Sequence, residues 1–417
     1  MKYYLGVDIG TTSVKAIAFS DSGDVLAKHA IAYGMQHPNP DWSEQDPAEI
    51  ERAVTQSINS VVARMAPAKP ALLSFSAAMH SLLAVDATGQ SLTPCMIWAD
   101  NRAALIAESL RETDTGQQFY HATGTPIHAM SPFCKLLWLK ANEPAVFAAA
   151  HKFIGIKEYL FYKWFGVYAI DSSIASASGL LNLVALEWDK AILNFVGIDA
   201  GKLSTPVPVK EIFHYEPGSN SGHALQLDRK TPFVIGSSDG ALANIATGSY
   251  SLVVTIGTSS AARILTPNRE TDKYMRSFCY HARDSEYIVG GAGNNGAVVL
   301  QWLKESLLQT TQGFEQLFAQ AAQAPPGSDG LLFLPYILGE RAPLWNPRAK
   351  GVFFGLDISH TRAHMIRAVL EGIIYGVYSI GRVIMENNDP TEIYAGGGFA
   401  QSSLWVQVLA DVFNKKV

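Results

Sequence analysis

Apolar and polar residues alternate along the first part of the chain with the period of a β-strand. The run YYLGVDI at 3–9 is followed by GTTS, by VKAIAFS at 14–20, by DSGD and by VLAKHAIAY at 25–33. Gly, Ser, Thr and Asp are the residues that tight turns favour. The pattern therefore predicts three consecutive antiparallel strands, rather than the strand, turn and helix of a nucleotide-binding βαβ unit.

The pattern changes to a helical period after this meander. Asp46 can serve as an N-cap, Pro47 fits the first helical position, and Glu49 stands where a capping box has its acid. Apolar residues then recur every three to four positions, which predicts one buried helix face: Ile50, Val54, Ile58, Val61 and Met65.

Strand and helix patterns alternate through the rest of the chain. ALLSFSAAMHSLLAVD at 71–86 contains two strand-like runs broken by AMH, and helical patterns cover roughly 101–112, 134–150, 295–309 and 360–386. Stretches rich in Pro and Gly at 204–208, 217–222 and 325–330 predict loops. This alternation indicates an α/β architecture.

One short segment occurs twice. VDIGTTS at 7–13 and VTIGTSS at 254–260 share Val, Ile, Gly, Thr and Ser in the same frame, and an apolar strand pattern stands on both sides of each. The repeat suggests two related domains, each with a glycine–hydroxyl hairpin. A chance match is the alternative, since the chain is rich in Gly, Ser and Thr.

Composition narrows the classes of protein to consider. The chain has 417 residues, 48% of them hydrophobic and 17% charged, with a formal charge of −5. That charge gives no reason to expect binding to nucleic acid or to an anionic membrane surface. The three cysteines (Cys95, Cys134 and Cys279) are far apart and predict neither a disulfide framework nor a zinc site. With no targeting signal and no apolar run of about 18 residues, we expect a cytoplasmic protein.

The repeated hairpins could bind phosphate, because main-chain N–H groups and hydroxyls converge there. The first offers Gly10, Thr11 and Thr12 with Lys15 just beyond, and Asp8 could hold Mg²⁺ through water. The second offers Gly257, Thr258, Ser259 and Ser260. Taken singly, each is equally well an ordinary hairpin turn. The chain has no G-x-G-x-x-G that opens a helix after the first strand and no P-loop motif, which argues against a dinucleotide oxidoreductase and a P-loop ATPase.

Other segments carry candidate chemistry. Asp239 in VIGSSDGALAN follows an apolar strand and could accept a proton from a substrate hydroxyl; a turn or helix-cap role is the alternative. AMH (78–80) and IWADNRA (97–103) supply the donors and acceptors that a polyol needs, although His80 and Trp98 could be structural. GGAGNNGAVVLQW (290–302) and AGGGFAQSS (395–403) are glycine turns that lead into helices. GERAPLWNP (339–347) suggests no role by its chemistry.

Together these segments resemble the FGGY family of carbohydrate kinases, from DIGTTSVK at the start to GGGFAQSSLWVQVLADVF at the end. GVFFGLDISHTRAHMIRAVLE (351–371) resembles the C-terminal signature of the family throughout. MSPFCKLLWLKAN (130–142) resembles the N-terminal signature, with Ala141 where a polar residue is usual. FSAAMHSLLAVD, WADNRA, GTPIHAMSPFCKL and GIKEYLFY are most similar to the gluconate kinases.

The resemblance implies a fold and a function for each of two domains. It implies two ribonuclease-H-like domains of the actin-like ATPase kind around a central cleft. Residues 1–245 would bind the sugar and carry the first phosphate hairpin. Residues 246–417 would bind the nucleotide, and we expect this domain to lack its C-terminal end, because family members usually continue past DVFNKKV. Two hairpins on different domains would close over ATP and sugar.

The resemblance also implies residue roles. Asp239 would be the general base and, with Asp8, a ligand of Mg²⁺. The sugar site would be lined by Met79, His80, Asp100, Arg102 and Asp239. Nucleotide and phosphate would be bound by Gly10, Thr11, Thr12, Lys15, Gly257, Thr258, Ser259, Gly296, Gln301, Gly397 and Gly398.

The expected reaction is transfer of the ATP γ-phosphoryl group to the C6 hydroxyl of gluconate. A xylulose kinase of the same family is the first alternative, and a non-catalytic actin-like nucleotide switch is an alternative of another class. The substrate carboxylate needs a cation or N–H donors, for which Arg102, Lys157, His80 and His128 are candidates. Arg102 could instead pair with Asp100, and Lys157 with Glu158. The expected partner is a small-molecule sugar acid or sugar, and a homodimer is the expected assembly if the chain associates.

Overall fold

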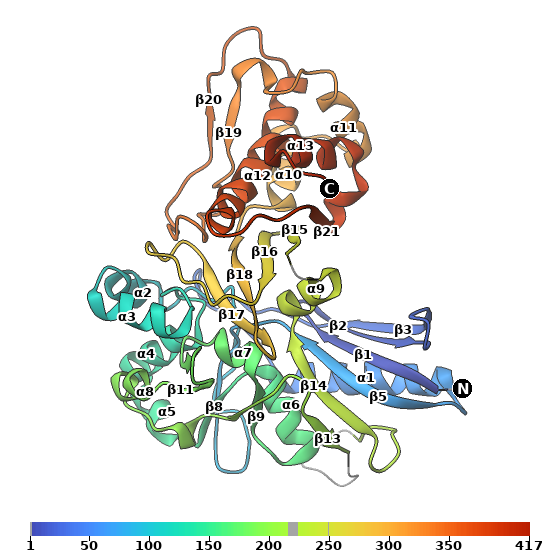
Figure 1. Ribbon diagram of the computed structural model, residues 1–417, viewed down its shortest axis with the longest axis vertical. Helices are drawn as coiled ribbons and strands as arrows, with labels where there is room; N and C mark the ends of the chain where they lie inside the picture. Colours follow the sequence, from blue (N-terminus) through green and yellow to red (C-terminus); the bar gives the residue numbers. More distant parts are fainter. Residues whose placement is uncertain (1, 216–223, 249) are drawn as a thin grey trace. The chain divides into compact units, whose positions relative to one another are not determined.

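The alternating segment at the start of the chain forms the predicted meander in the computed structural model (Figure 1). Strand β1 (Lys2–Ile9) pairs with β2 (Ser13–Phe19), and β2 pairs with β3 (Val25–Ala32), both antiparallel. The structure describes residues 2–215, 224–248 and 250–417. The loop predicted at 217–222 lies outside the described residues.

The described chain divides by its internal contacts into two units. The first contains the residues up to Leu242 and the segment Tyr280–Glu286, and the second contains Ala243–Cys279 and Tyr287–Val417. The division falls within helix α9 (Asp239–Thr247), where the sequence predicted a boundary between residues 245 and 246.

The meander belongs to a six-stranded sheet at the centre of the first unit, with the order β13-β14-β5-β1-β2-β3. Strands β5 (Lys69–Ala77) and β14 (Pro232–Ser238) continue the sheet parallel to β1, and β13 (Ile212–His214) is antiparallel to β14. Helices α1 (Pro47–Met65) and α6 (Ile156–Phe165) bury their apolar residues in the same core. The core includes Val7, Phe75 and Phe233 of the sheet, Val54, Ile58 and Val61 of α1, and Leu160, Phe161 and Trp164 of α6.

Helix α1 confirms the predicted N-cap, first residue and buried face, but not the capping box. The Asp46 carboxylate accepts the N–H of Ala48 at the N-cap, and Pro47 is the first helical residue. Glu49 does not act as the capping-box prediction has it, because its carboxylate accepts the N–H of Gly34 at 3.3 Å, after β3. The first turn of α1 is thereby tied to the end of the meander.

Shorter elements complete the first unit. Its short strands pair into two-stranded sheets, here called ribbons. They are β4 (Glu44–Gln45), β6 (Leu83–Val85), β7 (Cys95–Met96), β8 (Lys152–Ile154), β9 (Ala169–Asp171), β10 (Leu181–Asn182), β11 (Glu187–Trp188) and β12 (Thr205–Val207). Its other helices are α2 (Ala104–Arg111), α3 (Asp114–Thr123), α4 (Pro132–Asn142), α5 (Pro144–Ala149), α7 (Ser172–Ser176), α8 (Lys190–Val196) and a 3₁₀ turn, Ala200–Lys202.

Two sequence predictions in this unit are wrong in detail, both at prolines. The helix predicted over 134–150 is two helices, because Pro144 forces the preceding Glu143 out of helical geometry, to φ −128° and ψ 54°. The loop predicted at 204–208 contains strand β12, which pairs in parallel with β9. Pro206 is tolerated there because the ribbon has only two strands, and every strand is an edge.

A five-stranded sheet with the order β17-β18-β16-β15-β21 belongs mainly to the second unit, except for its residues in the segment Tyr280–Glu286, which belong to the first. Its strands are β15 (Leu252–Ile256), β16 (Ser260–Thr266), β17 (Phe278–Arg283), β18 (Glu286–Gly293) and β21 (Ile393–Gly396). The other elements are α10 (Ala297–Trp302), a π-helical turn (Leu303–Leu307), α11 (Phe314–Ala321), a 3₁₀ turn (Ser328–Gly330), β19 (Leu332–Leu334), β20 (Val352–Phe354), α12 (Arg362–Met385), a 3₁₀ turn (Gly398–Gln401) and α13 (Ser403–Phe413).

Helix α12 is the predicted helix at 360–386 and the main core helix of the second unit. It is long and apolar enough to cross a bilayer, but 67% of its most apolar window is buried within the protein. Its buried residues include Ile366, Val369, Ile373, Val377 and Ile380. A helix buried to this extent is typical of a protein core rather than of a membrane span.

The repeated sequence segments form equivalent hairpins, one in each unit. Strand β1 runs antiparallel to the next strand and parallel to the later β5; β15 is likewise antiparallel to β16 and parallel to β21. The turns differ by one residue, since Ile9 pairs with Val14 whereas Ile256 pairs with Ser260. The repeat is therefore structural and not a chance match.

Candidate functional site

The carboxyl ends of three parallel strands meet at one edge of the first sheet. The register places Ile9 of β1 opposite Ala77 of β5, and Ala77 opposite Ser238 of β14. The residue after each strand therefore lies at the same edge, and the N–H of Ala78 donates to the Ile9 carbonyl at 3.0 Å. This edge brings together the first hairpin, the Met79–His80 segment and Asp239. It is the usual place for a ligand site in an α/β sheet.

The first hairpin turn is held by bonds from neighbouring segments. The Gly10 N–H donates to the Ser13 carbonyl at 3.0 Å, and the Gln45 amide donates to the Thr11 carbonyl at 2.7 Å. The Trp98 indole N–H donates to the Thr11 hydroxyl at 2.9 Å, so Trp98 of IWADNRA supports the hairpin. Thr11 is thus engaged in holding the turn.

Two predicted phosphate ligands of this hairpin are exposed. Thr12 lies at the tip, and Lys15 lies on β2. Lys15 faces the half-buried Asp8 across the β1–β2 pair, so these two charged residues are cross-strand neighbours. An exposed hydroxyl and an ammonium beside the turn are groups that can bind a phosphate.

Asp239 is exposed at the first position of helix α9. Its carboxylate accepts the N–H of Gly240 at 2.6 Å. The neighbouring Ser238 is buried, lies 3.0 Å from the hydroxyl of Ser173, and accepts the N–H of Ala241. The sequence offered a cap role as the alternative for Asp239, and the residue is at the helix start and exposed.

His80 has an unusual main-chain conformation at the end of β5. Its φ is +69°, in the left-handed region that side-chain-bearing residues seldom adopt. The ring Nδ1 lies 2.9 Å from the Ala177 carbonyl oxygen, and the ring packs edge-on against Tyr280 at 5.9 Å between centroids. His80 is buried and Met79 is half-buried. The surroundings hold His80 in one orientation at the candidate site.

Lys135 is a functional candidate that the sequence analysis missed. Its side chain is completely buried in α4, and its ammonium donates to the carbonyls of His80 at 2.6 Å, Ile97 at 2.7 Å and, more weakly, Met96 at 3.5 Å. Burial lowers its pKa to about 7, against attraction from Asp100. Lys135 links the segment of His80 to the segment of Trp98 and Asp100. Its sequence signal was a lysine inside the apolar stretch PFCKLLWL.

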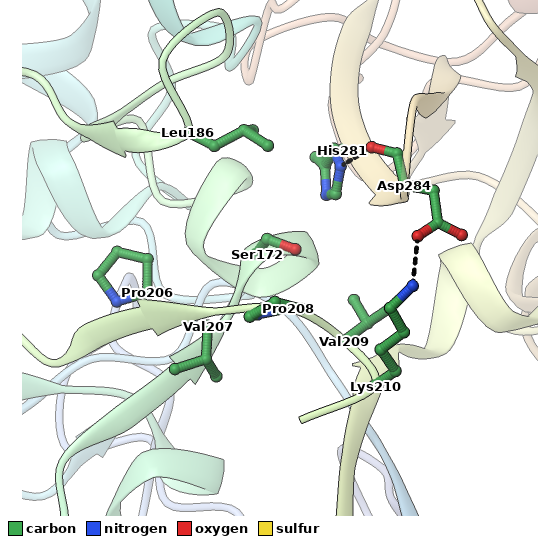
Figure 2. Close-up of a pocket in the computed structure, with 9 residues that line it drawn as sticks. All are labelled: Ser172, Leu186, Pro206, Val207, Pro208, Val209, Lys210, His281 and Asp284. Carbon is green, nitrogen blue, oxygen red and sulfur yellow. Dashed lines mark hydrogen bonds and ion pairs between the residues drawn. The ribbon is translucent and has the colours of Figure 1, made fainter. Parts of the chain in front are cut away.

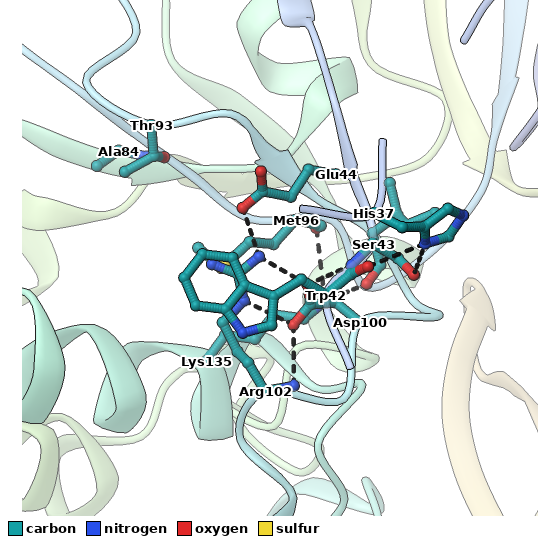
Figure 3. Close-up of polar contacts among 11 residues, drawn as sticks. His37, Trp42, Ser43, Glu44, Ala84, Thr93, Met96, Asp100, Arg102 and Lys135 are labelled. Carbon is teal, nitrogen blue, oxygen red and sulfur yellow. Dashed lines mark hydrogen bonds and ion pairs between the residues drawn. The ribbon is translucent and has the colours of Figure 1, made fainter. Parts of the chain in front are cut away.

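The Asp100 and Arg102 side chains form a closed network with Glu44 (Figure 3). The Arg102 guanidinium pairs with Asp100 at 2.7 Å and with Glu44 at 2.5 Å, and all three side chains are at most 8% exposed. Its carbon lies 3.8 Å from the ring centroid of Trp42 and 5.0 Å from that of Trp138. Asp100 also accepts the N–H of Ser43 at 2.8 Å.

This network bears on the sugar-binding roles expected of Asp100 and Arg102. Arg102 is enclosed by two carboxylates and two indole rings, so its charge is already compensated and it is a poor partner for a substrate carboxylate. Asp100 has no exposed surface, so contact with a sugar would require it to leave its partners. In this structure both side chains hold the loop at the sheet edge, and their contact with a sugar stays a prediction.

Lys157 is likewise not available to a substrate. Its ammonium pairs with Asp171 at 2.5 Å, with side-chain exposures of 3% and 0%, and not with Glu158 at a solvated surface. Burial lowers the pKa of Lys157, and the Asp171 carboxylate opposes that shift. His128 is half-buried, and its Nδ1 accepts the N–H of Met130 at 3.2 Å. His80 and His128 are the two remaining residues that the sequence offered as partners of a carboxylate.

Glu158 stands beside this pair and gives a pH prediction. Burial raises its pKa to about 7 from an ordinary value of 4.5, although Ser204 and the Gly155 N–H donate to it. Between about pH 4.5 and 7 the folded chain therefore keeps a proton that the unfolded chain has released, and stability should fall as pH rises. We expect Glu158→Gln to become more stable relative to wild type across this range, by up to about 1.4 kcal/mol per pH unit. Urea unfolding of both proteins from pH 4.5 to 8 measures the difference, and parallel profiles would contradict it.

The predicted nucleotide residues meet at the carboxyl ends of β15 and β21 in the second unit. These strands are parallel, with Thr255 opposite Gly396, so the Gly257–Ser259 turn and the Gly397–Gly398 turn lie side by side. Gly397 has φ +97°, and a Cβ on it would lie 2.5 Å from the Ile256 carbonyl oxygen. Gly257, Thr258, Gly397 and Gly398 are exposed. Two exposed glycine turns in contact form a surface that a phosphate or a flat ring can approach closely.

Gly296, at the start of α10, is hydrogen-bonded to the Gly257–Ser259 turn. The start of α10 donates to the turn, from Gly296 N–H to the Thr258 carbonyl at 3.2 Å and from Ala297 N–H to the Gly257 carbonyl at 2.7 Å. Gln301, farther along the helix, donates to Glu305. Glu340 of GERAPLWNP is buried and accepts the main-chain N–H of Asn294 at 2.6 Å and the Asn295 amide at 3.0 Å. GERAPLWNP therefore braces the turn before Gly296, a role the sequence analysis did not find.

Replacing Gly296 by Ala should displace the second hairpin. The added Cβ would lie 2.5 Å from the carbonyl oxygens of both Gly257 and Ser259, closer than packing allows. Overpacking of about 1–3 kcal/mol at this place predicts an increase of roughly tenfold in the KM for ATP, with the KM for the sugar unchanged. Gly313→Ala is a matched control, because the space around its Cβ is open. A wild-type KM for ATP in Gly296→Ala would contradict the prediction.

The predicted metal ligands fit an ion that arrives with the nucleotide. Asp8 lies on β1 and Asp239 directly follows β14, with β5 between these strands, so their main chains are about two strand spacings, roughly 10 Å, apart. Among the described residues no group of three or more His, Cys, Asp or Glu side chains could hold a metal. One or two carboxylates together with phosphate and water is the ordinary coordination of Mg²⁺.

A separate pocket of about 340 Å³ opens elsewhere in the first unit (Figure 2). It is lined mainly by the segment Pro206–Lys210 with Ser172, Leu186, His281 and Asp284. Lys210 and Asp284 form an exposed ion pair at 2.8 Å on its rim. Its lining differs from the set of residues that the sequence predicted for the site.

Comparison with known proteins agrees with this geometry. The model of the N-terminal domain of the FGGY family of carbohydrate kinases matches residues 3–246, and that of the C-terminal domain matches residues 252–417. The gluconokinase of Bacillus subtilis is 43% identical over 100% of this chain and 83% of its own length. The xylulose kinase of Staphylococcus xylosus is 29% identical over 100% of this chain and 87% of its own length.

Solved structures show the same two-domain fold. A gluconate kinase from Lactobacillus acidophilus superposes with a TM-score of 0.95 at 35% identity, covering 99% of this chain and 85% of the other. A ligand-bound xylulose kinase from the same organism has a TM-score of 0.95 at 34% identity, covering 100% and 85%. Both domain models match along the chain, and each unit carries a glycine–hydroxyl hairpin beside a parallel strand, so this chain belongs to the FGGY family of carbohydrate kinases, which use ATP to phosphorylate an alcohol group.

Proposed function

We propose that the chain transfers the γ-phosphoryl group of ATP to the C6 hydroxyl of D-gluconate and forms 6-phosphogluconate. The observation that carries this proposal is the shared edge of β1, β5 and β14, where a phosphate hairpin, a polar sugar segment and an exposed carboxylate adjoin. The 43% identity with a gluconokinase supports gluconate as the substrate. The first unit would bind the sugar, and the second the nucleotide.

Asp239 is the proposed base. An aspartate has a pKa near 3.9 and an alcohol is about as weak an acid as water, near 16, so the carboxylate cannot ionise the hydroxyl beforehand. In a loose phosphoryl-transfer transition state the attacking oxygen carries little charge at first. As the bond from O6 to phosphorus forms and the bond from phosphorus to the ADP oxygen breaks, Asp239 takes the hydroxyl proton. The exposed carboxylate at the end of β14 is accessible for this step.

The phosphates would be bound by the two hairpins. Thr12 and Lys15 are exposed on the first hairpin, and Thr258 on the second. Their donors would offset the negative charge on the transferring group. Gly397 and Gly398 would allow the adenosine to approach, and Gly296 and Gln301 would support the second hairpin. Mg²⁺, when bound to the phosphates, supplies further charge compensation, and Asp8 and Asp239 are its proposed protein ligands.

Recognition of the gluconate carboxylate would fall to His80 and His128. Arg102 and Lys157 are held in buried ion pairs, and His80 lies at the end of β5, at the edge shared with β1 and β14. Met79 and the main chain around His80 would contact the rest of the sugar. Asp100 and Arg102 would hold the 97–102 loop in place, as Lys135 does from the other side.

Xylulose is the second candidate substrate. A solved xylulose kinase superposes as closely as the gluconate kinase does, and a curated one matches along the whole chain. The carboxylate distinguishes the two substrates, because xylulose has none. A cytoplasmic location is proposed with either substrate, since the three cysteines are buried and unpaired, as in a reducing compartment.

ADP release in the presence of gluconate, xylulose, ribulose and glycerol tests the function. We expect the highest kcat/KM with gluconate, together with formation of a phosphosugar in a single turnover. Preference for xylulose would move the assignment to the second candidate. Release of inorganic phosphate without a phosphosugar would favour a nucleotide switch and contradict a kinase.

A further inference from the structure

Strand β14 contains a bulge at Ile235–Gly236, three residues before Asp239. The register runs from Val234 opposite Ser74 to Ser237 opposite Ser76, so Ile235 and Gly236 together face the single residue Phe75. Gly236 has φ +72°, and a Cβ on it would lie 1.8 Å from the Phe75 carbonyl oxygen. Bulges bend a strand and re-aim the residues that follow. Here the residues that follow the bulge, Ser237 and Ser238, lead directly into the proposed base.

The bulge takes main-chain groups out of the sheet ladder, and other segments satisfy them. The N–H groups of Ile235 and Gly236 donate to the carbonyls of Glu211 at 3.0 Å and Val209 at 3.1 Å. The Lys157 ammonium donates to the carbonyls of Ile235 at 3.0 Å and Ser237 at 3.4 Å. The side chain of a buried lysine on α6 thus supplies the hydrogen-bond donor that main-chain N–H groups of a neighbouring strand would otherwise supply to these carbonyls.

Asp171 joins this lysine to helix α7. One carboxylate oxygen pairs with the Lys157 ammonium at 2.5 Å, and the other accepts the N–H of Ile174 at the helix start, at 2.9 Å. The Ser173 hydroxyl of the same helix lies 3.0 Å from the Ser238 hydroxyl. The ion pair and α7 therefore hold residues 235–238 from two directions.

We propose that Lys157, oriented by Asp171, is a positioning residue that holds the β14 bulge and thereby sets the place of the Asp239 carboxylate. This inference rests on the proposed role of Asp239. A contribution to stability alone explains the pair less well, because a buried ion pair is often no more stabilising than apolar residues of the same volume. Both main-chain carbonyls that the Lys157 ammonium contacts belong to the segment that leads into Asp239.

The first test removes the pair without leaving a buried charge. In Lys157→Met/Asp171→Asn, Asn can still cap α7, and Met fills the lysine stem. We expect kcat to fall about 100-fold, as for a misplacement of the base by about 1 Å, with the KM values for gluconate and ATP within about threefold of wild type. Lys163→Met is the matched control, a buried lysine on the same helix whose ammonium lies over Tyr159. A kcat loss no larger than that of the control overturns the proposal.

A milder variant covers the case in which the double variant does not fold. Lys157→Arg keeps Asp171 paired, but its planar guanidinium cannot reproduce the donor geometry of an ammonium on both carbonyls. We expect a kcat about tenfold below wild type with unchanged KM values. A wild-type kcat in Lys157→Arg would overturn the proposal as well.

Coupling to Asp239 separates positioning from general damage. If Lys157 acts through the base, adding Asp239→Asn to Lys157→Met/Asp171→Asn should lower kcat far less than Asp239→Asn does in the wild type. Losses that multiply fully would overturn the inference. The failure of the proposed function looks different: Asp239→Asn alone would then remain active, whatever the ion-pair variants do.

Discussion

Replacing Asp239 by Asn should lower the kcat for gluconate phosphorylation by about 10²–10⁴-fold, the range of a general base. The amide keeps the shape and can still accept the Gly240 N–H, but it cannot take the proton of the C6 hydroxyl. Because the change does not remove donors from either hairpin, the KM for ATP should stay within about threefold. Steady-state kinetics with varied ATP and varied gluconate separates the two parameters.

Asp228→Asn is a matched control for this substitution. It removes a carboxylate from the same unit, at an exposed ion pair with Lys69 whose side chains are 55% and 70% exposed. Such pairs contribute little, so activity and stability should not change. An active Asp239→Asn enzyme, with kcat within about threefold of wild type, would end the assignment of the base.

Replacing Arg102 by Met should have the largest effect on stability. It leaves the Glu44 and Asp100 carboxylates buried without their cation, and breaking a buried pair in this way costs about 3–5 kcal/mol. The stacking against Trp42 and Trp138 would be partly kept by the apolar side chain. Urea unfolding of the first unit measures the change in the free energy of unfolding.

Two companions test the reason for that loss. Arg102→Met combined with Glu44→Gln and Asp100→Asn should recover much of the stability, because no unpaired charge then remains buried. Arg283→Met, at a half-exposed pair with Glu286, should cost less than about 1 kcal/mol. A loss in Arg102→Met as small as that in Arg283→Met would contradict a buried network.

The local elements were predictable from the sequence because their signals are short-range. The alternation at 3–33 and the three-to-four-residue period at 50–65 each need only neighbouring residues, and both were confirmed. The errors in element boundaries arose at prolines, whose effect differed from what the surrounding sequence pattern predicted. Pro144 splits a helix whose apolar pattern runs on, and Pro206 stands in a strand because that strand is at an edge.

The candidate site was predictable in part. The repeated glycine–hydroxyl hairpins, the Met79–His80 segment and Asp239 were identified because each follows an apolar strand, and the ends of parallel strands share an edge. Lys135 was missed, since a lysine in an apolar helix shows nothing of the carbonyls it will meet. The bulge in β14 was also missed, because only the pairing with β5 reveals that two residues face one.

By itself the sequence determined the succession of strands and helices, the duplicated hairpin and the family to which the chain belongs. Only the tertiary structure decided which charges are free to act. In sequence, Arg102 and Lys157 look like cations that could bind a ligand. Arg102 pairs with the nearby Asp100 but also with Glu44, which is remote along the chain. Lys157 pairs with Asp171, which lies on another element. A solvated charge needs no partner, whereas burying a charge without one costs much free energy. The role of each of these two cations therefore depends on whether folding buries it, which the sequence does not show.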